Sequence, residues 1–158
     1  MKKKIFALLA AMLMSAVSYA QFEEGKTYLN ASVSGLDLNY TKRDNWSANL
    51  SGSVGYTFLD NWMVLANLEY GYHDKESSIS IGPAIRYYVV QNGLYLGAGT
   101  SYVHRPSSYN DFMPHVHVGY AYFVNGHLTI EPELYYNQSF NNQDYSGIGV
   151  RVGLGFYF

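Results

Sequence analysis

Five charged residues have the types and positions that ion-pair or acid–base chemistry requires. Each falls at a polar position of a stretch in which polar and apolar residues alternate: Glu69, Arg86, Glu131, Glu133 and Arg151. A buried charge must pair because leaving it alone away from water is costly, and we expect Glu133 and Arg151 to lie on neighbouring strands at similar depth. The sequence therefore predicts an interior network of ion pairs, with a gate whose pairs exchange partners as the alternative.

Two histidines, His115 and His117, are spaced so that both would lie on one face of a strand. Tetrahedral zinc would need a third and a fourth donor close by, and no carboxylate falls clearly in place. We therefore expect hydrogen-bonded interior histidines, and we predict neither a metal site nor a cofactor.

Catalysis by a nucleophile would need a hydroxyl group with a base within reach. Two groups of residues come closest to this arrangement: His127, Thr129 and Glu131, and His73, Glu76, Ser77 and Ser78. Neither has the spacing of a known catalytic motif, and serine is common on any polar strand face. The sequence therefore predicts no catalytic residue, while an enzyme stays open as an alternative.

The elements that would position these groups are strands, because apolar and polar residues alternate with a period of two. Eight such segments are expected, over about 27–40, 46–58, 62–73, 78–89, 94–102, 112–122, 128–137 and 146–158. A change of phase at Gly35 predicts a β-bulge. Pro83, Pro114 and Pro132 predict irregular pairing because proline has no N–H to donate.

The connections between these segments alternate in length. Tight turns are expected around Asp60, Asn92 and Asn125, and longer polar loops over 41–45, 73–77, 105–111 and 141–145. Residues 1–20 combine a basic start with a short apolar run and small residues at 18 and 20, as in a secretory signal peptide. This leaves 21–158 as one domain, and its lack of cysteine excludes a disulfide framework.

Composition indicates which face of the strands is outside. Charged residues make up 14% of the chain and aromatic residues 17%, which is too few charges for a surface that meets water everywhere. Aromatic residues also gather near both ends of the apolar face, as in the girdles of a membrane barrel. The predicted girdles are Trp46, Tyr70, Tyr72, Tyr102, Phe112 and Tyr136 at one end, and Phe58, Trp62, Tyr87 and Tyr122 at the other. A soluble lipocalin-like barrel, with the apolar face turned inward around a ligand, is the alternative.

The last strand ends with aromatic residues in a specific pattern. Arg151, Gly153, Phe156 and Phe158 match the terminal signal by which bacterial outer-membrane barrels are recognised and inserted. With its eight predicted strands, the chain resembles the OmpA/OmpX-type family of small outer-membrane barrels. The resemblance implies an all-β fold, an eight-stranded antiparallel up-and-down transmembrane β-barrel.

The same resemblance implies a location and partners. We expect a monomer in the outer membrane of a Gram-negative cell, in contact with lipid and lipopolysaccharide and inserted by the barrel-assembly machinery. The net charge of −2 gives no reason to expect nucleic-acid binding. The expected role is structural or at the cell surface, without a wide pore, because side chains fill an eight-stranded barrel. The alternatives are a lipid-A-modifying enzyme, a narrow gated ion channel and an adhesin.

Overall fold

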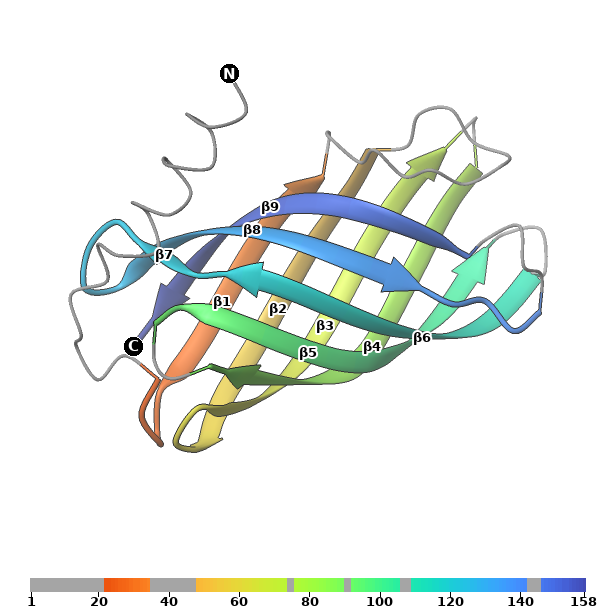
Figure 1. Ribbon diagram of the computed structural model, residues 1–158. Helices are drawn as coiled ribbons and strands as arrows, with labels where there is room; N and C mark the ends of the chain where they lie inside the picture. The colour runs from red at the N-terminus through yellow and green to blue at the C-terminus, as the bar shows by residue number, and fades with distance from the viewer. Residues whose placement is uncertain (1–21, 35–47, 74–75, 90–91, 106–108, 142–145) are drawn as a thin grey trace, which may run out of the picture.

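The computed structural model describes residues 22–34, 48–73, 76–89, 92–105, 109–141 and 146–158. Within these ranges the chain forms strands that wrap around one central axis (Figure 1). Their bounds are β1 Thr27–Ser34, β2 Ala48–Leu59, β3 Trp62–His73, β4 Glu76–Tyr88, β5 Leu94–Arg105, β6 Tyr109–Tyr120, β7 Tyr122–Phe123, β8 Leu128–Asn137 and β9 Gly147–Tyr157. No helix in these ranges is long and apolar enough to cross a membrane.

The sheet closes on itself. Strands β1 to β6 pair antiparallel in chain order, β8 pairs with both β6 and β9, and β9 returns to β1. The short β7 continues β6, because both pair with β8 in one register, Gly119 with Glu133 and Tyr122 with Ile130. The prediction of a closed, eight-stranded antiparallel barrel is confirmed.

The apolar face of this barrel points outward. Leu50, Leu68 and Ile81 are 56%, 55% and 58% exposed, whereas the adjacent Ser51 is buried. The same alternation runs through β8 and β9, whose inner residues are buried and whose outer residues are exposed. The lipocalin-like alternative is therefore wrong, because its apolar side chains would have to fill the interior.

Two of the three prolines, Pro83 and Pro132, interrupt pairing without shifting it. Pro114 pairs with Thr100 in an unbroken β5–β6 ladder, so the irregular pairing expected there is not seen between these strands. Between β4 and β5 the ladder stops after the pair Ile81–Tyr102 and resumes at Ala84–Gly99 in the same register, on either side of Pro83. The break between β6 and β7 lies opposite Pro132, which cannot donate to that side. No β-bulge occurs at these prolines, and the register shift recorded for the described pairs lies near the turn after β2, between Thr57 and Leu59.

Close approach of two strands accompanies the break at Pro83. The β5 backbone comes so near to Gly82 that a Cβ there would meet the carbonyl oxygen of Thr100. Glycine is therefore required at this position by space rather than by conformation.

Two of the predicted long loops are shorter than expected. Strands β3 and β4 stay paired to His73 and Glu76, and β5 and β6 stay paired to Arg105 and Tyr109. The predicted loops 73–77 and 105–111 were wrong in extent, because backbone pairing continues after the apolar alternation has ended. The predicted bulge at Gly35 and the predicted loop 41–45 lie outside the described residues.

Candidate functional site

A buried arginine joins several polar side chains inside the barrel. Arg86 projects inward from β4, and one of its terminal nitrogens lies 3.2 Å from the hydroxyl oxygens of Tyr28 and Tyr88 and from Oε2 of Glu131. The other terminal nitrogen lies 3.5 Å from Oε2 of Glu133. The guanidinium carbon also lies 3.9 Å from the centre of the Tyr95 ring, where the π face attracts a cation.

Glu131 on β8 receives hydrogen bonds on both carboxylate oxygens. The Tyr28 hydroxyl donates to Oε2 at 2.6 Å, while Thr129 and Tyr157 donate to Oε1 at 2.7 and 3.1 Å. With Arg86 added, a carboxylate that is 2% exposed has four partners. Multiple partners of this kind are what a buried charge needs to be stable.

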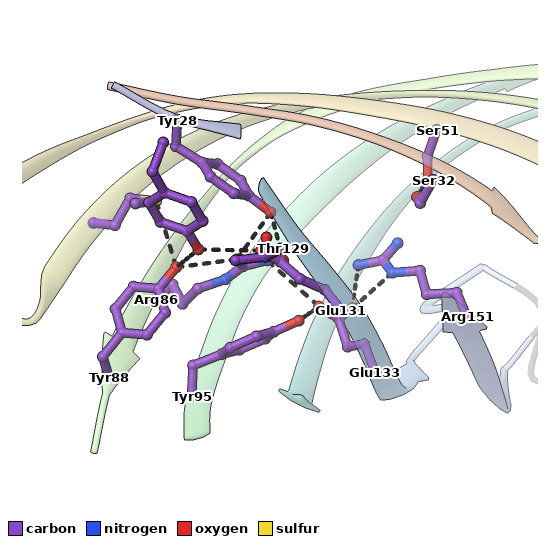
Figure 2. A network of polar contacts seen from close by, with 12 residues as sticks. Tyr28, Ser32, Ser51, Arg86, Tyr88, Tyr95, Thr129, Glu131, Glu133 and Arg151 are labelled. Atoms are coloured by element: carbon purple, nitrogen blue, oxygen red, sulfur yellow. Dashed lines mark hydrogen bonds and ion pairs between the residues drawn. The ribbon is translucent and has the colours of Figure 1, made fainter. Parts of the chain in front are cut away.

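Glu133 links the first arginine to a second one. Its Oε1 accepts from Nε and Nη2 of Arg151 at 2.7 and 2.5 Å, and its Oε2 accepts from the Tyr95 hydroxyl at 2.9 Å. Both guanidinium nitrogens of Arg151 thus bind the same carboxylate oxygen, in hydrogen bonds that are strengthened by the opposite charges. Figure 2 shows that the side chains converge from different strands into one continuous network.

The barrel topology explains why these residues meet. Glu133 and Arg151 are register partners on β8 and β9, so period-two alternation turns both inward at one level. Arg86 lies on β4, on the opposite wall, and reaches both glutamates across the interior. Glycines leave room for the large inner rings, since a Cβ at Gly119 would meet the ring of Tyr95.

These bonds connect four of the five charged residues that the sequence singled out. The fifth, Glu69, is half-buried on the inner face of β3, opposite Ser51 and Ser80. Ser51 in turn contacts Ser32 through their hydroxyl groups. Sequence reasoning missed the four inner tyrosines that complete the network: Tyr28, Tyr88, Tyr95 and Tyr157. The sequence does contain a signal for these tyrosines, because each of them falls at a polar, inward-facing position of its strand.

A small cavity adjoins the network. Its volume is about 20 Å³, and its lining includes Arg86, Glu133, Arg151 and His117. Both ring nitrogens of His117 and Nε of Arg86 are buried there without a hydrogen-bond partner among the described residues. The space is of the size of a water molecule, which is far below the size of an organic ligand.

The two histidines do not form a metal site with other residues in the described ranges. The rings of His115 and His117 stack with centroids 5.8 Å apart, and Nδ1 of His115 lies 3.5 Å from the Ser101 hydroxyl. Groups of three His, Cys, Asp or Glu side chains that could hold a metal are not found in this part of the chain.

The residues of the first group considered for catalysis do not converge. Thr129 and Glu131 bond to each other inside the barrel, whereas His127 is exposed at the turn before β8 and places Nδ1 2.8 Å from the Tyr157 carbonyl oxygen. The second group lies at the opposite end, where the side chains of His73 and Glu76 are outside the described part. In the first group, therefore, the histidine is not positioned to act on the threonine.

The aromatic residues predicted as girdles lie on the outer face wherever they are described. Trp62 and Tyr87 are register partners whose rings are 4.8 Å apart, and Tyr102 is paired with Phe112. The exposed ones are Phe58, Trp62, Tyr70, Tyr102, Phe112, Tyr122 and Tyr136, and Tyr87 is half-buried. Trp46 and the side chain of Tyr72 lie outside the described residues.

The residues of the predicted assembly signal divide between the two faces of β9. Arg151 and Gly153 point inward, and Arg151 is bound to Glu133. Phe156 and Phe158 point outward and are 40% and 60% exposed. The terminal aromatic side chains are therefore accessible in the closed barrel.

We compared the chain with models of known protein families and with curated proteins. The model of the "Outer membrane protein beta-barrel domain" family matches residues 6–158. Among curated proteins, no match is found.

Solved structures share the fold at low sequence identity. Neisserial surface protein A (NspA) is 15% identical with a TM-score of 0.64, over 84% of this chain and 96% of that one. The N-terminal barrel domain of Pseudomonas aeruginosa OprF is 19% identical with a TM-score of 0.63, over 85% and 98%. OprG from Pseudomonas aeruginosa is 14% identical with a TM-score of 0.62, over 89% and 99%. At these identities the likeness concerns the fold alone.

Proposed function

Because this chain belongs to the outer-membrane β-barrel domain family, we propose that it is a monomeric, non-catalytic integral protein of the bacterial outer membrane. Its role is structural or at the cell surface, and it forms no wide pore. The outer face of the barrel supports the membrane location, and the interior supports the lack of a wide pore.

The outer face supports contact with lipid. Its middle carries exposed aliphatic side chains, such as Val54, Leu68 and Ile81, and its ends carry exposed aromatic rings. An apolar band between two aromatic levels is the surface that a bilayer solvates. The same band gives the acyl chains of outer-membrane lipid and lipopolysaccharide a surface to contact.

The barrel interior supports the proposal that the protein forms no wide pore. The network of Arg86, Glu131, Glu133 and Arg151 spans the barrel from wall to wall, and the cavity beside it has a volume of only about 20 Å³. Charged groups held by several partners each do not leave their positions easily. This filled cross-section is the single observation on which the functional proposal depends.

The test combines folding with conductance. Full-length protein is produced in a Gram-negative host, and the barrel is extracted into detergent and run on a gel with and without boiling. We expect a heat-dependent change in mobility, because a closed barrel stays compact until it is heated. In planar bilayers the folded protein should show no large, steady conductance. A steady open conductance like that of a wide porin would contradict the proposal.

A narrow gated channel is the second candidate, and one observation favours it. Arg86 lies within reach of Glu131 and Glu133, and Glu133 is shared with Arg151. An exchange of partners within this network would open a narrow path. In this case brief conductance events should appear, and removing the Arg86 charge by Arg86→Met should change their frequency.

Phe158→Ala tests the proposed interaction with the barrel-assembly machinery. The Phe158 side chain is 60% exposed, so its loss removes little interior packing, and the substitution keeps the backbone bonds between Phe158 and Thr27. We expect export to continue while the amount of heat-modifiable barrel in the outer membrane falls severalfold. The matched control is Phe140→Ala, which removes a ring that is 73% exposed in the connection after β8. Equal barrel levels for Phe158→Ala and the control would refute the signal interpretation.

A further inference from the structure

The segment before β1 contributes a side chain to the barrel interior. Phe22 is fully buried although it precedes the first strand. Its ring stacks on Tyr88 with centroids 3.8 Å apart and an angle of 12° between the planes. Phe123 and Tyr157 contact it edge-on, at 5.6 and 5.7 Å.

Backbone bonds fix this segment across the end of the barrel that carries the tight turns. The Asn61 N–H donates to the Phe22 carbonyl at 2.9 Å, and the Gly25 N–H donates to the Thr57 carbonyl at 2.8 Å. The Glu24 N–H donates to the Asp60 side chain at 3.0 Å. The segment is therefore attached to the turn between β2 and β3 rather than only tethered to β1.

The buried ring lies directly beside the polar network. Tyr88 and Tyr157 share a hydrogen bond of 2.8 Å between their hydroxyl groups, and Tyr157 also donates to Glu131. Phe22 packs against both of these tyrosines, stacked on the ring of Tyr88 and edge-on to the ring of Tyr157. Removing it would expose to water the residues that hold Glu131.

We propose that Phe22 is an N-terminal plug that seals the tight-turn end of the barrel against water. The Phe22 ring fills the space between Tyr88, Phe123 and Tyr157, so the plug is a segment of the chain itself. A plug at this end would seal the barrel whether its role is structural or channel-forming.

The lack of cysteine in the chain permits a direct accessibility test. Ala121 belongs to the same buried cluster as Phe22 and is 2% exposed. Full-length Ala121→Cys protein is produced in cells, extracted into detergent and treated with a water-soluble maleimide. We expect slow labelling with Phe22 present. Phe22→Ala should accelerate it by about tenfold or more, because removing the ring leaves a cavity through which water and the maleimide can reach residue 121.

Two controls separate sealing from general destabilisation. Phe58→Ala removes an outward aromatic ring at the same end, so it should leave Ala121→Cys protected. Val124→Cys, at an exposed turn position, should be labelled rapidly with or without Phe22. The heat-dependent mobility shift reports that each variant is a closed barrel.

The proposal is overturned if labelling of the closed Phe22→Ala barrel stays as slow as that of the parent. It is also overturned if the parent is already labelled as fast as Val124→Cys. Should Phe22→Ala fail to close, Phe22→Leu replaces it, with an intermediate labelling rate expected and an unchanged rate contradicting the plug.

Discussion

Replacing Glu133 by glutamine should lower the free energy of unfolding by about 3–5 kcal/mol, the usual cost of breaking a buried ion pair. The substitution keeps the shape of the side chain but removes its charge. Arg151 then loses the carboxylate that binds it at two points, and Arg86 loses one of its two carboxylate partners. The measurement is urea unfolding of the barrel in lipid vesicles, followed by tryptophan fluorescence.

A matched variant and a double variant test whether this loss of stability comes from the buried ion pairs. Glu23→Gln makes the same chemical change at an exposed position and should alter stability by less than about 0.5 kcal/mol. Adding Arg151→Met to Glu133→Gln should recover part of the loss, because it removes the cation whose ion pair with Glu133 was broken, while Arg86 keeps its pair with Glu131. If Glu133→Gln were as mild as Glu23→Gln, the network would not be what holds the interior together.

The second large effect is expected on the outer face. Val54→Arg should cost about 2–4 kcal/mol, the penalty for a cation on the lipid-facing side near the middle of the bilayer. Val54 lies midway between Leu50 and Phe58 on the outer face of β2 and is 56% exposed. The same urea titration in vesicles measures the change.

Val124→Arg is the control because it makes the same substitution at nearly equal exposure. Val124 is 53% exposed but lies in the turn after β7, beyond the apolar band. There the cost should be about 0–1 kcal/mol, as at the membrane interface. Equal costs at the two sites would mean that the middle of the barrel is surrounded by water, which would contradict insertion in a bilayer.

Much of the fold could be predicted because strand alternation has a strict period. The predicted strand 128–137 coincides with β8, and its two faces alternate between buried and exposed as expected. A shift of one residue would turn every charged side chain into lipid, so the pattern determines the phase. Strand ends were less accurate, since pairing to Glu76 and Tyr109 depends on the backbone and needs no apolar residue.

Contacts across the interior were harder to predict than contacts between neighbouring strands. Glu133 and Arg151 are adjacent in register, so their strand phases alone suggest the pair. The contact of Arg86 with Glu131 joins opposite walls, and it depends on how far the strands tilt when the barrel closes. The burial of Phe22 could not be predicted from periodicity, because a single aromatic residue before the first strand is not part of any alternating segment.

The pairing of β1 with β9 has a consequence for the order of folding. Every other ladder joins segments that are close in the chain, but Thr27 exchanges backbone bonds with Phe158 at 3.0 and 2.9 Å. Loop closure over nearly the entire domain must therefore come last, after the hairpins have formed. Until that step, two strand edges would face hydrocarbon with unpaired amides. The barrel should consequently behave as a single cooperative unit, in which no partly closed form persists at equilibrium.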